Sequence, residues 1–536
     1  MIVVTFDVLL HLEEQQVRLG LERQSERLET TLADRSHVRR NPAAHARQLL
    51  LRVGKAEFEA TRHLCVAPVR GYLISIQRGE VLFHNGRQLL KIAEPLVALA
   101  PTAVVLLAAL ALLRDLRWLG LHWQEGPATG GTHGPYYQAQ RLEIYRRYYD
   151  ELAANGASYP CFCSGDQLAM ARRAQRIAGQ PPRYPGTCAN LSADEVQHRL
   201  DAGMQPTVRF RVPVGEAIEF DDLVRGGQCF QSDEIGDFII RRSDGSAAFF
   251  FTNAIDDALM GVTHLLRGED HLTNTPRQLL ILKALGLQAP AYGHVSLLVG
   301  ADGAPLSKRH GSRSVRELRE QGYLPAALLN YLARLGHSFD SDALCDLDQL
   351  AAGFSLQRLG RAPARFDEQQ LGHWQKEAVG AASLAELVDW FKLSPEYREL
   401  PVAPDDTALE ALLAVLRDNV VMPADAAAWV RRLAGDELEP EPEAQQVLDA
   451  AGRAFFQQAL TALEGAGDFR SFAGAVGKAA DVKGRALFMP LRVALTGVTH
   501  GPEMQRVWEW LGPARCRSRL QDALNRIGAN PDAESL

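Results

Sequence analysis

The chain has 536 residues and a mass of 59.0 kDa, too much sequence for one hydrophobic core, which indicates roughly three to four domains. Apolar residues make up 46% and charged residues 23%, a balance that excludes a disordered, collagen-like or disulfide-stapled chain. The net charge of −7 gives no overall basic footprint for a nucleic acid, and seven widely spaced cysteines favour thiol or metal chemistry over a disulfide framework.

The first part of the chain shows no sustained pattern. Residues 1–94 mix arginine-rich stretches with short apolar runs, and neither a helical nor a strand period persists. Met1 is followed by no basic segment, so we expect no secretory signal. Pro95–Leu113 carries no charge, but Pro101 interrupts it and the unbroken part is short for a bilayer. We therefore expect an atypical region over residues 1–110, with a buried helix rather than a membrane span and no membrane partner.

Three cysteines lie at the spacing of metal ligands. A single residue separates Cys161 from Cys163, so one turn can present both thiols, and Cys188 is a natural third ligand. Zinc prefers four soft or borderline ligands in a tetrahedron. The pattern predicts a zinc site, with free thiols as the alternative.

Alternating residues predict strands in the next segment. Thr207–Val212 alternates apolar and charged residues, as a strand with one buried face does, and the alternation returns from Ile218. Gly226 and Gly227 interrupt it, and a further strand from Ile239 runs into a turn.

A basic motif follows a glycine-rich loop. Leu306-Ser-Lys-Arg-His-Gly311 comes directly after Gly300-Ala-Asp-Gly303 and before a charged helix. A loop lysine flanked by Ser307 and Arg309 suits phosphoryl and adenylyl transfer, since its charge can meet the charge that develops on pyrophosphate. The motif alone is also compatible with a solvated basic loop.

Beyond residue 320 the patterns become helical. A helix that opens at Leu324-Pro325 and closes at Gly336 would carry four leucines on one face: Leu328, Leu329, Leu332 and Leu335. Ser383–Glu386 and Thr407–Glu410 have the spacing of capping boxes. The sequence thus predicts an α/β half followed by an all-α half.

Many short motifs in one order resemble the bacterial glutamyl-tRNA synthetases, which are class I aminoacyl-tRNA synthetases. The resemblance runs from about residue 114 to the C-terminus, and its landmarks are Asp115-Leu-Arg-Trp-Leu-Gly-Leu121, Gly134-Pro-Tyr-Tyr137, Tyr159-Pro-Cys-Phe-Cys163, Asn253-Ala-Ile-Asp-Asp257, Arg267-Gly-Glu-Asp-His271, Leu306–Gly311 and Gly322-Tyr-Leu-Pro325. It implies a parallel α/β nucleotide-binding fold, split by an acceptor-stem insertion and followed by helical anticodon-binding domains.

The resemblance also implies roles for single residues. Lys308 matches the catalytic lysine of the family's "KMSKS" loop, in which Ser307, Lys308 and Arg309 would bind ATP and Pro305 replaces the usual first lysine. Arg267 and Asn253 match substrate-contacting residues. A guanidinium binds a carboxylate bidentately, as glutamate would require. The alternative for Arg267 is pairing with Glu269 or Asp270.

Two positions depart from the family pattern. Phe249 stands at a substrate-binding position where many members have tyrosine, so one hydroxyl is missing. Asn190 stands where members often have a histidine ligand, and Tyr184 then becomes the expected fourth zinc ligand beside Cys161, Cys163 and Cys188. Water in the fourth position, or an empty site, is the alternative.

The N-terminal signature of the class is missing before Asp115. Members carry two histidines, close to His-Ile-Gly-His, that stabilise the transition state at the ATP α-phosphate. A frameshifted or mis-started reading of the gene, or a real chain without this motif, explains the difference; the lack of periodicity in residues 1–94 favours the first.

The resemblance implies ATP-dependent ligation of glutamate to tRNA(Glu) through glutamyl-adenylate, with Mg²⁺, structural Zn²⁺ and a cytoplasmic monomer. We expect a catalytic domain over residues 111–335 with the insertion at about 160–250, a stem-contact domain over 336–395 and an anticodon-binding domain over 396–536. One rival is a catalytically impaired tRNA-binding protein. Another is the short enzyme that glutamylates a modified tRNA base, which the helical residues 340–536 argue against. The sequence leaves open whether tRNA(Gln) is also accepted.

Overall fold

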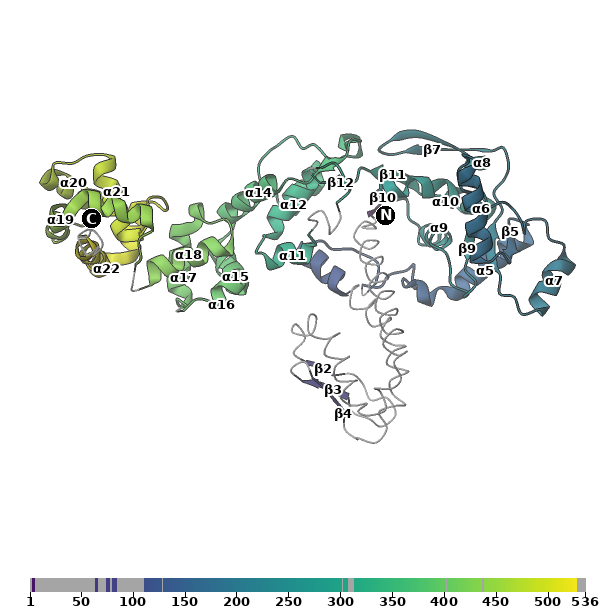
Figure 1. The fold of residues 1–536 in the computed structure, drawn as a ribbon, viewed down its shortest axis with the longest axis horizontal. Coiled ribbons are helices and arrows are strands. Elements are labelled where there is room, and N and C mark those ends of the chain that lie inside the picture. The colour runs from purple at the N-terminus through teal and green to yellow at the C-terminus, as the bar shows by residue number, and fades with distance from the viewer. Residues whose placement is uncertain are drawn as a thin grey trace. The chain divides into compact units, whose positions relative to one another are not determined.

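The computed structural model describes residues 2–4, 63–65, 74–77, 80–83, 110–127, 129–300, 302–306, 313–401, 403–435 and 438–527. The chain divides into two compact units. One consists of Met1–Leu116 with Val262–Gly268, and the other of Arg117–Gly261 with Glu269–Leu536 (Figure 1).

The first unit contains a parallel strand pair and an antiparallel sheet. β1 (Ile2–Val4) pairs in parallel with β10 (His264–Gly268), so that Ile2 lies opposite His264. β2 (His63–Cys65), β3 (Ile74–Gln77) and β4 (Glu80–Phe83) form an antiparallel sheet. Much of the unpatterned region of residues 1–94, and of the apolar stretch 95–113, lies outside the described residues, and the described helix there covers residues 110–118.

The larger unit begins with an α/β part whose core is aromatic. The predicted strands are confirmed as β6 (Thr207–Phe210), β7 (Ala217–Asp222) and β9 (Phe238–Arg241). β5 (Ser158–Cys161), β6 and β9 form one antiparallel sheet, and β7 pairs with β8 (Gly226–Gln231). Phe251 is fully buried and stacks on Tyr149 at 4.1 Å between ring centroids. This packing joins α9 (Phe249–Leu259) to α5 (Leu142–Ala154).

Short helices and strands complete the α/β part. They are η1 (Gln138–Gln140), α6 (Gly165–Ile177), α7 (Ala193–Asp201), α8 (Ser232–Ile235), η2 (Glu269–Asn274), α10 (Thr275–Ala284), β11 (Ala291–Val295) and β12 (Leu298–Val299). Ser164 and Ser192 cap α6 and α7 through complete capping boxes, in which a glutamine or a glutamate returns the hydrogen bond.

The rest of the unit is helical, as predicted, apart from the short β13 (Ala364–Arg365), which pairs with β12. Its helices are α11 (Val315–Glu320), α12 (Pro325–Arg334), α13 (Leu347–Gly353), η4 (Leu356–Arg358), α14 (Glu368–Ala381), α15 (Leu384–Leu393), α16 (Pro395–Arg398), α17 (Asp406–Leu416), η5 (Arg417–Asn419), α18 (Pro423–Ala434), α19 (Pro442–Leu463), α20 (Phe469–Ala480), α21 (Arg485–Thr496) and α22 (Met504–Arg526). α19 and α22 are each two helices that meet at a left-handed glycine, Gly452 and Gly512.

Two local predictions for these helices are wrong in detail. The capping box at Ser383 is confirmed, but α17 is capped by Asp405, whose carboxylate accepts the N–H of Ala408 at 2.9 Å. Thr407 therefore lies inside the helix. Leu332 is 41% exposed, because α12 buries Ala327, Leu328 and Tyr331 instead of a stripe of leucines.

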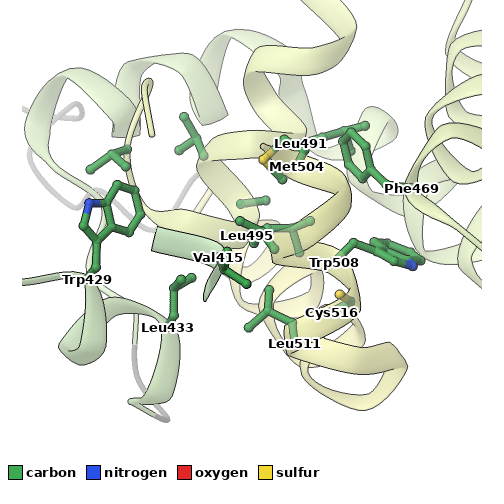
Figure 2. Close-up of a cluster of buried hydrophobic side chains, with 14 of the residues drawn as sticks. Val415, Trp429, Leu433, Phe469, Leu491, Leu495, Met504, Trp508, Leu511 and Cys516 are labelled. Atoms are coloured by element: carbon green, nitrogen blue, oxygen red, sulfur yellow. The ribbon is translucent and has the colours of Figure 1, made fainter. Parts of the chain in front are cut away.

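The helical core draws side chains from helices that are distant in sequence. Figure 2 shows Val415 of α17 and Trp429 and Leu433 of α18 beside Leu495 of α21 and Leu511 of α22. Phe472 stacks on Trp508 with ring centroids 4.7 Å apart. Burial of such large apolar surfaces is the main force that holds these helices together.

The backbone at Gly322 joins several helices. Its carbonyl accepts the Gln375 amide of α14 at 3.1 Å and the Trp390 indole N–H of α15 at 2.6 Å. Gln375 also donates to the carbonyl of Val421 at 3.0 Å. Gly322 has a φ of +96°, and a Cβ there would collide with the ring of Pro423, so only glycine fits.

Among the described residues, no helix combines the length and the apolar character needed to cross a bilayer.

Candidate active site and metal site

The structure brings together the three predicted cysteine ligands. Cys161 ends β5 and lies opposite Thr207 of β6. Cys163 follows in the loop before α6, and Cys188 lies in the turn before α7. The three Sγ atoms all lie within 4.8 Å of one another, and Cys161 and Cys188 are buried. Within the described ranges, this is the cluster of cysteine, histidine or acidic groups with metal-ligand spacing.

Tyr184 adds a fourth atom at suitable distances. Its Oη lies 3.3 Å from Cys161 Sγ and 3.7 Å from Cys163 Sγ, and Cys163 Sγ lies 3.6 Å from Cys188 Sγ. Bond lengths of about 2.3 Å to sulfur and about 2.0 Å to oxygen place tetrahedral ligands about 3.8 Å apart for two sulfurs and about 3.5 Å for sulfur and oxygen. The four side chains therefore fit the shell of a zinc ion.

Three of these side chains differ in how readily they lose their protons. Burial raises the pKa of Cys163 and of Tyr184, so both groups need a positive partner to lose their protons. Burial also acts to raise the pKa of Cys161, but contacts with the Tyr184 hydroxyl and the Arg209 guanidinium outweigh it and lower this pKa to about 7. Cys161 is therefore the thiol in this cluster that most readily takes the deprotonated form that binds metal.

A buried acid holds the helix that carries two predicted substrate-binding residues. Phe249 begins α9 and Asn253 follows one turn later; both are partly buried. The Asp256 carboxylate of the same helix accepts Arg141 Nε at 2.6 Å and the Tyr145 hydroxyl at 2.7 Å. Burial raises the pKa of Asp256, while these donors favour its charge. The network ties α9 to α5 and sets the position of Asn253.

Arg267 lies on β10 in the smaller unit and is 1% exposed. Its predicted alternative partner, Glu269, begins η2 in the larger unit, where it forms an ion pair with Arg225 and accepts the backbone N–H of Leu297 at 3.2 Å. Glu269 is therefore engaged in joining η2 to its neighbours.

The basic loop itself, with Ser307, Lys308 and Arg309, lies outside the described residues. The turn before it is tight: Gly300 and Ala304 form a hydrogen bond of 2.9 Å, and the N–H of Leu306 reaches Leu298 at 3.0 Å. After the loop, Ser314 caps α11 through a capping box with Glu317. Both ends of the loop are thus anchored in regular structure.

One buried polar network escaped sequence reasoning. Asp222 accepts His294 Nδ1 at 2.5 Å, and His294 Nε2 lies 3.0 Å from Thr275 Oγ1. All three residues are buried, and they join the end of β7 to β11 and to the start of α10. No spacing signal could have found them, because they come from three separate segments.

Comparison with known proteins shows that two protein families match consecutive parts of the chain. Residues 108–373 match the family of class I tRNA synthetases (E and Q), catalytic domain, and residues 383–524 match an anticodon binding domain. Glutamate–tRNA ligase 2 of Nitrosococcus oceani is 54% identical over 420 residues, which are 78% of this chain and 87% of that protein. The chain belongs to the glutamate–tRNA ligase family. The enzyme of the same name from Alkalilimnicola ehrlichii is 54% identical over 427 residues, 79% of this chain and 88% of its own length.

Solved structures of glutamate–tRNA ligases share the fold. A ligase from Elizabethkingia meningosepticum, in complex with its amino acid, superposes with a TM-score of 0.70 at 24% identity and covers 78% of this chain and 89% of its own. The synthetase of Elizabethkingia anophelis has a TM-score of 0.68 at 23% identity, with coverage of 78% and 89%. These findings confirm the predicted fold class. As a member of the ligase family, the chain is an aminoacyl-tRNA synthetase, a class that uses ATP and Mg²⁺.

Proposed function

We propose that this chain ligates glutamate to tRNA(Glu) in two steps. The glutamate carboxylate attacks the ATP α-phosphate and releases pyrophosphate, and the terminal ribose hydroxyl of the tRNA then takes the glutamyl group from the adenylate. The observation that carries this proposal is 54% identity to a glutamate–tRNA ligase over 420 residues, together with the family matches to a catalytic and an anticodon-binding domain.

The proposed roles follow the chemistry of each side chain. Lys308, with Ser307 and Arg309, would neutralise charge on the departing pyrophosphate. Arg267 would bind a carboxylate of glutamate through its planar guanidinium. Asn253, one turn along α9 from Phe249, would also contact the substrate.

We also propose that Cys161, Cys163, Cys188 and Tyr184 hold one structural zinc ion. Three observations support this: the spacing of the sulfur atoms, the distances from them to the tyrosine oxygen, and the burial of the cluster. Such an ion would fasten β5 to the segment before α7 and so stiffen this part of the α/β domain.

The domain division proposed for tRNA binding follows the predicted boundaries. Residues 111–335 would form the catalytic domain, with the insertion at about 160–250 against the acceptor stem, 336–395 would contact the stem, and 396–536 would bind the anticodon. We propose a cytoplasmic monomer. The anticodon match over residues 383–524 argues against the short enzyme that modifies a tRNA base.

Two assays on the full chain test the ligase proposal. Exchange of labelled pyrophosphate into ATP should depend on glutamate, and the chain should charge tRNA(Glu) with glutamate. The same charging assay with tRNA(Gln) shows whether this tRNA is also accepted. Filter binding at increasing salt reports whether tRNA is held through its phosphates, since such affinity falls steeply with salt. Nothing in the described residues favours the impaired alternative. Salt-sensitive tRNA binding without exchange or charging would nevertheless indicate the catalytically impaired tRNA-binding protein. In that case, a family N-terminus grafted before Asp115 should restore charging.

A further inference from the structure

The proposed metal site has a buried cation beside it. Arg209 of β6 is 5% exposed, and its guanidinium carbon lies 3.7 Å from the centroid of the Tyr184 ring. Nη1 donates to the carbonyl of Asp237 at 3.1 Å. The register between β6 and β9 shifts between Val208 and Arg209, an irregularity of the kind that re-aims a side chain.

Few partners in the described part of the chain hold this cation: besides the Asp237 carbonyl, it contacts the Cys161 thiol. Its Nε is buried with no hydrogen-bond partner among the residues that the structure describes, and within those residues it forms no ion pair with a carboxylate. The nearby Asp237 carboxylate is already engaged, because it accepts the Tyr159 hydroxyl and the N–H of Val212. A buried charge is costly unless an opposite charge or a full set of hydrogen bonds compensates it.

The proposed zinc shell supplies that opposite charge. Three thiolates and one phenolate around Zn²⁺ would carry a net charge of −2, and the Arg209 guanidinium contacts both the Cys161 thiol and the Tyr184 ring. The backbone N–H of Cys188 donates to Tyr184 Oη at 2.8 Å and so orients this oxygen. A cation over the ring and a donor at the oxygen together fix the orientation of this side chain beside the three sulfur atoms.

We propose that Arg209 is a positioning residue for the metal site: its guanidinium, stacked on the Tyr184 ring, holds this side chain with its oxygen beside the cysteine sulfurs and thereby sets the affinity for zinc. This inference rests on the proposed zinc site. It assigns to Arg209 a role in metal binding through Tyr184, in addition to any contribution to folding.

The same strand region offers a matched control. Arg211 also lies over a tyrosine, with its guanidinium carbon 4.7 Å from the Tyr159 ring centroid, but it is exposed and Tyr159 is not a proposed ligand. Its guanidinium donates to the carbonyls of Gly156 and Ala189. Replacing Arg211 therefore removes an arginine–tyrosine stack and the hydrogen bond to Ala189, but it removes no hydrogen bond or ring contact to the side chain of a proposed ligand.

The experiment measures zinc binding by the full chain, with a chromophoric chelator as competitor. Zinc added to the metal-free protein should also produce the ultraviolet difference band of a tyrosinate. We expect Arg209→Met to weaken zinc binding by about 10- to 100-fold, the usual effect of losing an outer-shell partner, and to remove most of the tyrosinate band. Arg209→Lys should keep part of both signals. Arg211→Met should leave both within about twofold of the wild type, a margin well below the outer-shell effect.

A double-mutant cycle separates this role from a general effect on folding. If Arg209 acts through Tyr184, Arg209→Met should cost clearly less affinity in a Tyr184→Phe background, where only its contact with Cys161 remains to be lost, whereas a purely structural effect would cost the same in both backgrounds. Wild-type affinity and a full tyrosinate band in Arg209→Met would overturn the inference while leaving the zinc site standing. A wild-type protein that binds no zinc would overturn both. If Arg209→Met fails to fold, Arg209→Lys in the two backgrounds gives the same decision.

Discussion

Lys308 is the residue whose proposed role is closest to the chemistry. Lys308→Ala should lower glutamate-dependent pyrophosphate exchange by roughly two to four orders of magnitude, because the charge that meets the developing pyrophosphate is lost. The control is Lys283→Ala, since Lys283 is a surface lysine of α10 paired with Glu216. Exchange at a near-normal rate in Lys308→Ala would remove this loop from the mechanism.

The cysteine cluster gives a second test at single residues. Freshly purified, metal-replete protein should contain about one zinc per chain, and Cys188→Ser should lose most of it, since one thiolate of the shell disappears. Cys229→Ser serves as the control because Cys229 is an exposed free cysteine of β8. Elemental analysis decides, and zinc-free wild-type protein would contradict the site.

The Asp222–His294–Thr275 network joins elements that are far apart in sequence, and its contribution to the free energy of unfolding depends on pH. Burial acts to raise the pKa of Asp222, but its hydrogen bonds with His294, Arg225 and Val224 outweigh burial and hold this pKa below the usual range. The unfolded chain therefore takes up the proton at higher pH than the native one. The stabilisation is complete above about pH 5 and is lost as pH falls through the folded pKa.

Asp222→Asn should accordingly lower the free energy of unfolding by about 2 kcal/mol at pH 7, with a difference from wild type that shrinks towards pH 3. Urea unfolding at several pH values measures this difference. Asp221→Asn, at the exposed neighbouring position, is the control. A difference that does not change with pH would show that the Asp222 carboxylate is not the group responsible.

A single buried arginine donates hydrogen bonds to the carbonyls at the ends of two helices in the C-terminal part. Arg519 of α22 donates to the carbonyl of Leu495 at the end of α21, and to those of Arg432 at 2.7 Å and Leu433 at 3.1 Å at the end of α18. Arg519→Met would leave these terminal carbonyls without donors, and we expect a loss of about 2–4 kcal/mol in the free energy of unfolding.

Denaturant unfolding checks this value, with Arg515→Met as the control on the same helix because Arg515 is exposed beside Trp510. Equal stability of the two variants would mean that water or backbone shifts satisfy the helix ends.

Elements with a clean local signal could be predicted from sequence, and those that depend on distant partners could not. The alternation at Thr207 predicted β6, and Ser383 predicted the start of α15, because both signals lie within a few residues. The N-cap of α17 was predicted two residues too late. The side chains of Asp405 and Thr407 can both accept the capping hydrogen bond, and the backbone conformation decides which one does. The partners of His294 lie 72 and 19 residues away, and the stack of Arg209 on Tyr184 crosses from a strand to a loop. Local patterns carry no trace of such pairs.

At the scale of the whole molecule, the two regions that match protein families each contain a hydrophobic core. One core surrounds Phe251 in the α/β part, and another joins α17 to α22 in the helical part. Leu324 packs against the helical core and also against the smaller core around Tyr331. The helical part is therefore continuous in packing with the segment that follows the basic loop.

The hydrogen bonds at Gly322 bear on how this protein can be divided for expression. A fragment cut at residue 383, where the anticodon-binding match begins, would keep the Trp390 indole and the Val421 carbonyl but lose the Gly322 carbonyl and the Gln375 amide that pair with them. It would also uncover the apolar surface on which Leu324 packs, and such a surface promotes aggregation. A cut just before Ser314 keeps α11, α12 and α14 with the bundle and leaves every one of these bonds intact. The boundary of the sequence family is thus not the boundary at which the helical half should be expressed alone.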